Sequence, residues 1–505
     1  MEYAIAVIDI GMTNKKAALY DDALHQLDAK YRNFDPKIEE GMETHDLSGM
    51  ETWFISCLKD FAARYPVKAL AVTTHGATFV CTGEDGKPAL PCVYYTHEPG
   101  EDFHRRFYGQ FGKPEELQKR TGTPAFKAMI NPAKGLFFAQ EQFPELFKNT
   151  VRVLPYPQYW GLRFTGKAGV ETTCMGNHTY LWDMIDGVLS SAARDLGLSG
   201  LIPDKLYNSW DILGTISGEF AEKTGLSKET IVTMGIHDSN SALLPHFAKK
   251  GAGGFILNST GTWCVIMNPV EQYGFAPEEL GKAVFFNISA FGKPVKTAIF
   301  LGGLEFETWS RFIMKHYSRT DIPGWNEALY RFILKEKKWF LLPELTPGSG
   351  QFPGSRARVV EEKKEYFFDH LTKVFPPCFA DYETAFALLR ISLLMQTITA
   401  LERAGLQKGY EIYTEGGFRK DQSYNRLLSS AFPESRVFLT GIAEASALGA
   451  AMTAKMALTG KSLPSLTGDF EIDYREIEKE IFPELAGYRA AWLAKAEEQR
   501  GADHG

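Results

Sequence analysis

The sequence predicts an α/β protein built as two lobes that face each other across a cleft. Three observations support this prediction. Predicted strands alternate with predicted helices along the chain, which is typical of α/β rather than all-helical proteins. A strand–turn–strand unit occurs once in each half of the sequence, and such an internal repeat indicates two related lobes. The length of 505 residues exceeds what one hydrophobic core usually serves, so two domains of about 200–250 residues are expected.

The first copy of the repeat, residues 4–20, has the pattern of two apolar strands joined by a short polar turn. Gly11 has no Cβ and lets the backbone approach a ligand closely. Hydrogen-bond donors gather around the same point, as a phosphate group requires; they are Thr13, Asn14, Lys15 and Lys16. A carboxylate beside an anion site needs a cation, so we expect Asp9 to hold Mg²⁺ through water. For this unit alone, an ordinary hairpin with a polar turn stays an open alternative.

The second copy, residues 254–267, repeats the order of strand, small polar turn and strand. The residues that take the places of Asp9, Gly11 and Thr13 in this copy are Asn258, Thr260 and Thr262. A duplicated unit of this kind suits a two-lobed fold that closes on the phosphates of a nucleotide.

Composition narrows the class of protein. An apolar content of 44% and a charged content of 23% are those of a soluble globular protein. The net charge of −7 argues against nucleic acid or an anionic membrane as partner. No apolar run approaches the length of a membrane span, and no signal peptide is recognised, so we expect a cytoplasmic protein. The six cysteines lack paired spacing, and the glycosylation patterns at residues 177–179 and 258–260 have no meaning without secretion.

Two strand ends in the first half attract attention. A helix at residues 49–65 and a buried strand at residues 67–74 precede His75 and Gly76. Open α/β sheets place ligand contacts at such strand ends, although a lone histidine there is more often structural. A second strand end, near Gly235, leads into Asp238. This carboxylate either caps the following helix or acts as a general base for a hydroxyl at the mouth between the lobes.

The second half contains a glycine turn between a strand and a helix. The pattern predicts a long amphipathic helix at residues 386–403, a strand at 410–414 and a helix around 422–431. Gly416 and Gly417, between that strand and helix, would let a planar adenine or its phosphates lie against the backbone. An ordinary turn explains one glycine better than two. A helix of small residues at 444–458 suits close packing against a neighbour.

Four segments, taken in order, resemble the FGGY carbohydrate kinases, and within them the L-fuculose and L-rhamnulose kinases most. The segments are residues 9–14, 235–238, 259–262 and 415–417. The resemblance implies two ribonuclease-H-like (actin-like) lobes, with an active-site cleft between them where ATP and sugar meet. Residues 1–245 would form the sugar-binding lobe with the catalytic base, and residues 246–505 the nucleotide-binding lobe.

The resemblance also implies roles for residues. Asp238 would be the catalytic base, and the sugar contacts would be Gly76, His237 and Ser239. His75 is a further candidate sugar contact from its place at the strand end alone. Positions that match the family's nucleotide site are Asp9, Gly11, Thr13, Asn14, Lys15, Lys16, Thr260, Gly261, Thr262, Gly416 and Gly417. Two positions depart from the family pattern. Phe418 stands where a third glycine is common, and Gly76-Ala77-Thr78 stands where the deoxyketose kinases tend to have Gly-Val-Asp.

We therefore expect transfer of the γ-phosphoryl group of MgATP to a hydroxyl of a ketose, with a deoxyketose such as L-fuculose or L-rhamnulose first. Three alternatives stay open: a kinase for another pentulose or a polyol, a non-catalytic actin-class ATP-binding protein, and a catalytically silent sugar sensor. The expected partners are the sugar and ATP, with a homodimer left open and with neither nucleic acid nor membrane.

Overall fold

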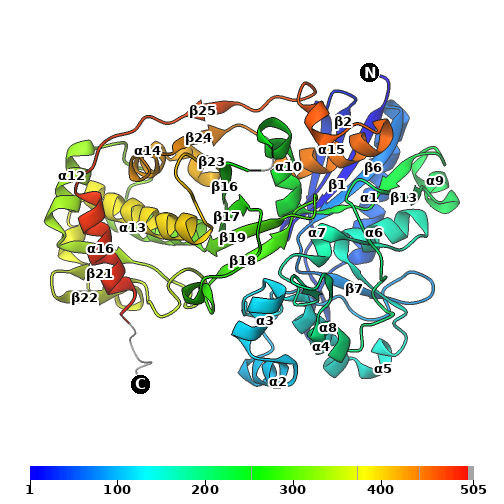
Figure 1. Cartoon of the computed structure of the whole chain (residues 1–505), viewed down its shortest axis with the longest axis horizontal. Coiled ribbons are helices and arrows are strands. Elements are labelled where there is room, and N and C mark those ends of the chain that lie inside the picture. Colours follow the sequence, from blue (N-terminus) through cyan, green and yellow to red (C-terminus); the bar gives the residue numbers. More distant parts are fainter. Residues whose placement is uncertain (252, 372–373, 443, 499–505) are drawn as a thin grey trace.

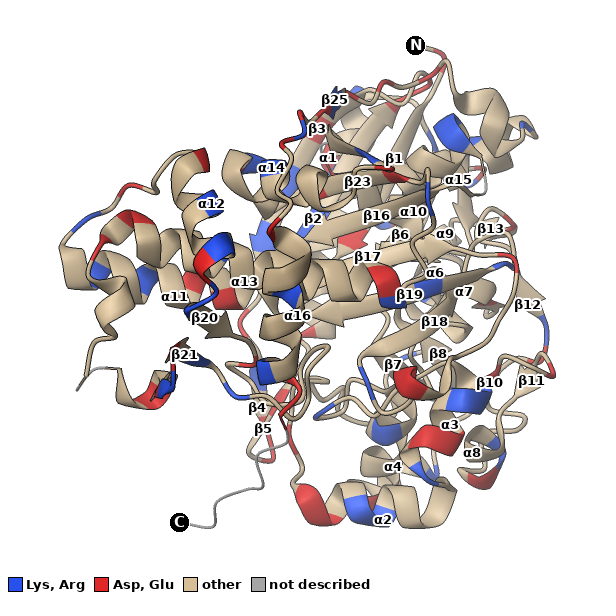
Figure 2. Cartoon of the chain, turned by 60° about the vertical axis from the view of Figure 1, so that its left-hand side comes forward, with Lys and Arg blue, Asp and Glu red and all other residues tan. Residues whose placement is uncertain are grey.

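The computed structural model describes residues 1–251, 253–371, 374–442 and 444–498. Two α/β lobes lie side by side, each built on a seven-stranded mixed sheet (Figure 1). The blue-to-green first half of the chain forms one lobe, and most of the yellow-to-red second half forms the other. In a turned view, Lys, Arg, Asp and Glu lie mostly on helices and loops, while most of the central strands are tan (Figure 2). The predicted fold class is confirmed.

The two sheets share one topology. The first runs β13 (Ile212–Thr215), β14 (Ile231–Thr233), β6 (Val67–Thr74), β1 (Ala4–Ile10), β2 (Asn14–Asp21) and β3 (Gln26–Asn33), with β15 (Ile236–His237) also paired to β6. The second runs β25 (Tyr474–Glu476), β24 (Arg436–Thr440), β23 (Glu411–Gly416), β16 (Phe255–Thr260), β17 (Cys264–Pro269), β19 (Pro294–Phe300) and β18 (Val284–Ile288). In both sheets an antiparallel hairpin pairs in parallel with a central strand, β6 or β23, which pairs in parallel with the next. This correspondence supports the predicted duplication.

The alignment of the two hairpins that the sequence predicted, with Asn258 in the place of Asp9, is wrong by one residue. The Gly11 amide donates to the Asn14 carbonyl at 3.0 Å, and the equivalent bond in the second hairpin runs from Gly261 to Trp263 at 2.9 Å. Gly261 therefore takes the place of Gly11, and the half-buried Ser259 takes the place of Asp9. A shift of one residue turns a strand side chain to the other face of its sheet. The second turn is also one residue shorter, which the sequence alone does not reveal.

Asn258, aligned with Asp9 from the sequence, consequently lies in the interior of the second lobe. Its side chain is fully buried, and Nδ2 lies 3.4 Å from both Thr414 Oγ1 and the Tyr424 hydroxyl. Alternation along the strand determines this placement, because Asn258 and Ser259 point to opposite faces.

Most of the predicted helices and strands occur close to their expected bounds. Residues 49–65 correspond to α1 (Leu47–Arg64), residues 410–414 to β23, residues 422–431 to α14 (Gln422–Ala431), and residues 444–458 to α15 (Ala445–Thr459). The remaining helices that shape the cleft are α4 (Pro132–Gln142), α7 (Thr172–Met175), α10 (Asp238–Lys250) and α11 (Gly302–Tyr317). The proposed division between residues 245 and 246 falls inside α10, which runs through it.

The long helix α13 (Tyr382–Arg403) differs from its prediction. It is buried nearly all round rather than along one stripe, so it is a core helix of the second lobe and not an amphipathic surface helix. Among the residues described, it is also the one helix long and apolar enough to cross a membrane by length and composition. The expectation that no apolar run approaches this length was wrong. Complete burial of its apolar window is typical of a core helix in a globular fold.

Helices α10 and α15 join the lobes. Although α15 belongs to the second half of the sequence, it packs on β1 and β6 of the first sheet (Figure 1). One apolar cluster contains Val7 of the first sheet, Leu257 of the second and residues of both helices. Gly449 lies against the backbone carbonyl of Ser241, where a Cβ would overlap that oxygen. The small-residue helix therefore packs closely on a neighbour, as the sequence indicated.

Gly449→Ala is expected to lower the free energy of unfolding by about 1–3 kcal/mol, because the added methyl would push two packed helices apart. Thermal or denaturant unfolding measures the change. The matched control is Gly109→Ala in α2 (Glu101–Phe111), where an added Cβ meets nothing within 4 Å. This control should stabilise the protein by about 0.5–1 kcal/mol through helix propensity. Equal effects at both positions would contradict the close packing of α10 and α15.

Strand β18, at the edge of the second sheet, is covered by the first lobe. The Phe286 amide donates to the Gly122 carbonyl at 2.9 Å, and the Ile288 amide donates to the Gly176 carbonyl at 2.7 Å. An edge strand otherwise leaves such groups unpaired. Residues around Gly176 are thus held in place by a strand of the opposite lobe.

Candidate active site

Asp9 lies at the cleft end of β1, beside the N-terminus of α15. Its Oδ2 accepts a hydrogen bond from Ser446 Oγ at 2.7 Å and lies 3.3 Å from Lys16 Nζ. Lys16 also forms an ion pair with Glu444, the residue that precedes α15. Burial raises the pKa of Asp9; the neighbouring lysine opposes this rise, and the charge of Asp238 adds to it. Asp9 and Asp238 are therefore close enough to sense each other's charge.

The sequence suggested that the adjacent Lys15 and Lys16 act at one point, but the structure separates their side chains. In the hairpin Lys16 stands opposite Asp9, and Lys15 stands opposite Ile10, so their side chains leave opposite faces of the sheet. Lys15 is buried, and its Nζ donates to the Met12 carbonyl at 2.6 Å. Burial lowers the pKa of Lys15 to about 8. Thr13 and Asn14 are exposed at the turn.

Gly76 and His237 meet at the ends of the neighbouring strands β6 and β15. A Cβ on Gly76 would overlap the side-chain amide of Asn177 and would lie 3.0 Å from His237 Cδ2. No side chain larger than hydrogen fits at this position without displacing one of them. His237 Nδ1 lies 3.2 Å from Asn240 Nδ2, and the His237 amide donates to Thr173 Oγ1 at 3.0 Å.

Asp238 is the first residue of α10, and His237 holds the N-cap position. The predicted alternative, in which Asp238 is the cap, is therefore wrong. Oδ1 accepts hydrogen bonds from the Ser239 amide at 2.6 Å and from Ser239 Oγ at 3.2 Å. Its side chain retains 32% of its exposure, so one side of the carboxylate is open to the cleft. Burial of the rest of this side chain raises the pKa of Asp238 to about 6, and the hydrogen bonds from Ser239 limit the rise.

Three histidines surround this corner of the cleft in their neutral form. Burial lowers the pKa to about 3 for His75 and His178 and to about 4 for His237. His75 has both ring nitrogens within reach of the protein, with Nε2 at 2.7 Å from Thr78 Oγ1 and Nδ1 at 3.2 Å from the Ile10 carbonyl. Its ring therefore holds the end of β1 against the residues after β6.

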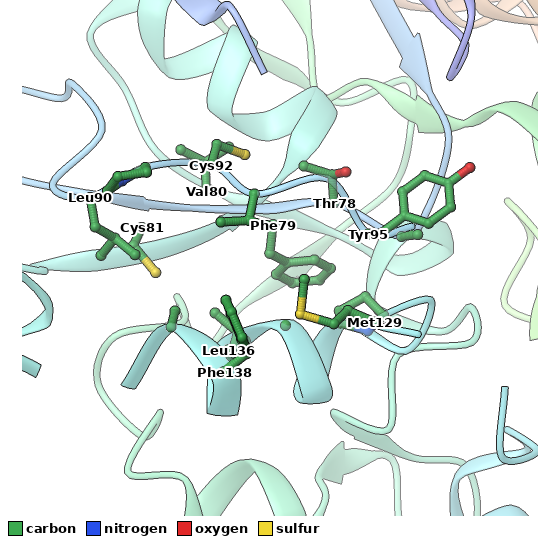
Figure 3. Close-up of a pocket in the computed structure, with 16 residues that line it drawn as sticks. Thr78, Phe79, Val80, Cys81, Leu90, Cys92, Tyr95, Met129, Leu136 and Phe138 are labelled. Carbon is green, nitrogen blue, oxygen red and sulfur yellow. The ribbon is translucent and has the colours of Figure 1, made fainter. Parts of the chain in front are cut away.

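A small cavity adjoins the same corner. It has a volume of about 50 Å³ between β7 (Phe79–Thr82) and α4, and most of the residues that line it are apolar. In Figure 3, Phe79 points from its strand toward Met129, while Thr78 and Tyr95 lie at one end of the cavity. The Tyr95 ring is 5.3 Å from that of His75, and the charge of Asp238 contributes to raising the pKa of Tyr95. Through Tyr95, one end of the cavity thus lies near His75 and Asp238.

The second lobe holds a larger cavity of about 610 Å³. Gly261 and Thr262 of the second hairpin, Gly303 at the start of α11, and Gly417 all contribute to its wall. A Cβ on Gly303 would overlap the Gly261 carbonyl, so this glycine lets the helix N-terminus reach the hairpin turn. Backbone amides at a helix N-terminus favour anions such as phosphate. The size and lining of the cavity suit a nucleotide.

The glycine turn after β23 forms one side of this cavity. Gly416 has a φ of +79°, and a Cβ there would overlap the Thr260 carbonyl, so the position requires glycine. Gly417 has more space, with the nearest atom to an added Cβ at 3.7 Å. Phe418 donates its amide to Thr260 Oγ1 at 2.9 Å, and its ring packs on Phe306 and Tyr424. The Phe418 side chain, which stands in place of a third glycine, therefore forms part of the floor of the cavity and packs into the core beneath it.

The residues present fit a magnesium ion bound mainly through water and phosphate. Within the described ranges, no group of three or more His, Cys, Asp or Glu residues forms a metal site of its own. Mg²⁺ usually keeps several waters and takes one or two carboxylates. Asp9 and Asp238, which are within electrostatic range of each other, form such a sparse set.

The structure adds residues to the site that the sequence reasoning missed. Asn177 appeared only as part of a glycosylation pattern, whereas Thr78 already lay in the strand end at residues 75–78 where ligand contacts were expected. Tyr95 lacked any signal. Glu444 and Ser446 lie in the segment predicted as a helix of small residues, but nothing in the sequence places them beside Asp9.

Duplicated lobes with a glycine-walled cavity in one and a buried carboxylate at the cleft define a class of two-lobed α/β proteins that bind nucleotides. Residues 4–245 match the FGGY family of carbohydrate kinases, N-terminal domain, and residues 252–462 match carbohydrate kinase FGGY, C-terminal domain. The chain therefore belongs to the FGGY family of carbohydrate kinases, which are phosphotransferases.

Individual relatives are distant. A rhamnulokinase from Ligilactobacillus salivarius is 26% identical over 203 residues, which is 40% of this chain and 40% of that protein. The chain thus matches well under half the length of this curated relative. The crystal structure of a carbohydrate kinase from Novosphingobium aromaticivorans is 27% identical, has a TM-score of 0.81, and is matched over 98% of this chain and 99% of that chain. A xylulose kinase from Lactobacillus acidophilus has a TM-score of 0.78 at 15% identity, over 98% and 97% of the two chains, and shows the same fold.

Proposed function

We propose that the protein transfers the γ-phosphoryl group of MgATP to a hydroxyl of a ketose, with a deoxyketose as the preferred acceptor. The observation that carries the proposal is the position of Asp238. This carboxylate lies at the N-terminus of α10, 3.2 Å from His237 Nε2, whose ring adjoins Gly76, and it is within electrostatic range of Asp9 on the hairpin side. Phosphoryl transfer depends mainly on positioning and on charge stabilisation of this kind.

In the proposed reaction, Asp238 accepts the proton of the attacking hydroxyl. Ser239 orients its carboxylate through two hydrogen bonds. The hairpin turns at Gly11 and Gly261 and the N-terminus of α11 bind the phosphates from the two sides of the cleft. Asp9 and Asp238 would hold a magnesium ion through water, and such an ion would supply positive charge to the phosphates. Closure of the lobes excludes water as a competing acceptor.

The preference for a deoxyketose is supported by the cavity between β7 and α4, most of whose lining residues are apolar. Ala77, Thr78 and Tyr95 line this cavity. Ala77 and Thr78 directly follow Gly76, so the cavity lies next to the group of Gly76, His237 and Asp238, which we call the acceptor corner. A terminal methyl group gains free energy on entering such a space, whereas a terminal hydroxyl would lose its hydrogen bonds to water there. The distant likeness to a rhamnulokinase agrees with this choice. Cytoplasmic localisation and a homodimer remain part of the proposal.

A coupled assay of ADP release across ketoses, deoxyketoses and polyols tests the function. The expected result is stimulation by a ketose, and the largest kcat/KM is expected for a deoxyketose. A polyol as best acceptor would favour the alternative kinase activity. ATP binding without stimulation by any acceptor would overturn the proposal in favour of a non-catalytic ATP-binding protein.

The rate should depend on pH through Asp238. A base acts when it is ionised, and burial raises the pKa of this carboxyl to about 6. We expect kcat/KM for the sugar to be level above about pH 7 and to fall toward tenfold per pH unit below about pH 6. Steady-state kinetics from pH 5 to 8, with a thermal melt at each pH to exclude unfolding, measures the profile. A level profile down to pH 5 would contradict this assignment.

A further inference from the structure

Asn177 is a buried amide without a protein partner. Its side chain is 2% exposed, and neither Nδ2 nor Oδ1 has a hydrogen-bond partner in the structure. Leaving a buried polar group unsatisfied costs about 1–3 kcal/mol, and such groups in native proteins call for an explanation. The explanation depends on what lies beside the amide.

The amide lies over Gly76, at the acceptor corner of the cleft. A Cβ on Gly76 would come within 2.9 Å of Asn177 Cγ and would also meet His237. Glycine at position 76 lets the Asn177 amide and the His237 ring approach the backbone at this point. The nearby ring of His178 lies 6.1 Å from that of His237, and both rings are neutral at pH 7 because burial lowers their pKa values. The neutral rings and the adjacent carboxylate of Asp238, whose Oδ1 lies 3.2 Å from His237 Nε2, suit hydroxyl groups rather than an anionic ligand.

The backbone, and not the amide, holds this segment in place. The Gly176 carbonyl accepts from Ile288 of β18, and the Thr179 amide donates to the Asn177 carbonyl at 2.7 Å. Asn131 Nδ2 donates to the His178 carbonyl at 3.2 Å. A Cβ on Gly176 would overlap the Ile288 side chain, so the second lobe presses directly on this turn. Asn177 is therefore presented rigidly from a segment that does not need its side chain.

We propose that Asn177 recognises the acceptor, with Nδ2 donating to one sugar hydroxyl and Oδ1 accepting from a second, and that it thereby determines which ketoses are phosphorylated. This inference rests on the proposed function and names the recognition group of the same site. An amide offers one donor and one acceptor side by side, which matches two neighbouring hydroxyls of an open-chain sugar. A site that hydrogen-bonds a hydroxyl strongly rejects an analogue that lacks it.

The test compares Asn177→Leu with Asn268→Leu. Asn177→Leu should reduce kcat/KM for the best ketose by about 10- to 100-fold, leave KM for ATP unchanged, and leave the melting temperature equal or higher, because an unpaired polar group is removed. Asn268 is also fully buried, but its Nδ2 donates to the Ala404 and Gly405 carbonyls. Asn268→Leu should lower the melting temperature and leave sugar specificity unchanged.

Analogues of the sugar that each lack one hydroxyl identify the contact. For an analogue that lacks one of the two contacted hydroxyls, the ratio of kcat/KM between wild type and Asn177→Leu should be clearly smaller than for the parent ketose, since one of the two lost contacts is already absent. If Asn177→Leu does not fold, Asn177→Ala takes its place in the same test, because alanine is smaller than asparagine. Unchanged kcat/KM for every ketose in a folded variant would overturn the inference. So would a lower melting temperature with unchanged specificity, which would show that the amide serves the structure through buried water.

Calorimetric binding of the ketose without ATP separates this inference from the proposed function. A wild-type protein that binds a ketose but does not phosphorylate it would contradict the proposed function. The loss of ketose binding in Asn177→Leu would still support recognition by the amide, and unchanged binding would contradict it. Absence of ketose binding by the wild type would contradict both.

Discussion

Asp238→Asn is expected to lower turnover with the best ketose by about 10²–10⁴-fold, the usual contribution of a general base. Asparagine has nearly the same shape as aspartate and can still accept a hydrogen bond from the Ser239 amide. It cannot accept the proton of an attacking hydroxyl. KM for ATP should change little, because the nucleotide cavity is in the other lobe and does not include residue 238.

Steady-state kinetics and a thermal melt measure this effect together. The melting temperature should be unchanged or slightly higher, because a partly desolvated carboxylate is replaced by a neutral group. Ser239→Ala serves as the matched control, since it removes one of the two donors that orient the carboxylate but keeps the base. Its loss of turnover should be clearly smaller. Near-full turnover of Asp238→Asn would show that another group takes the proton.

Gly417→Trp is expected to raise KM for ATP on the order of 100-fold, which corresponds to roughly 3 kcal/mol of lost binding. Gly417 borders the 610 Å³ cavity, and an added side chain at this position has space to extend into it. The indole would occupy volume that the nucleotide needs. The sugar site is in the other lobe, so KM for the sugar should stay within about twofold to threefold of the wild-type value.

The neighbouring glycine provides the control for this substitution. Gly416→Ala adds only a methyl group, but that methyl would overlap the Thr260 carbonyl at a positive φ. It should destabilise the lobe by about 1–3 kcal/mol or more and affect both substrates through folding. Nucleotide titration by calorimetry, together with melting temperatures, distinguishes a blocked cavity from general damage. Equal increases of both KM values in Gly417→Trp would contradict the placement of the nucleotide.

Periodicity and local composition were sufficient to predict the fold class, the repeated hairpin and most helices and strands. These features depend on residues close together in the chain: an apolar run ended by Asp9 and Gly11, or a helix of small residues that includes Gly449. The order of motifs then indicated the family, because each motif adds an independent restriction. Burial of α13 on all sides was not predictable in this way, since it depends on the layers packed around it.

The tertiary structure alone decided which residues meet. Strand alternation separated Lys15 from Lys16, and a turn shorter by one residue put Ser259, rather than Asn258, in the place of Asp9. Asn177 and Gly76 are distant in sequence, and they meet because Ile288 of the opposite lobe holds the turn beside Asn177. Local sequence determines the backbone conformation that a segment prefers. The register of strands and the contacts between lobes depend on long-range packing. That packing places the Asn177 amide beside Gly76 and the glycine-walled cavity beside the second hairpin.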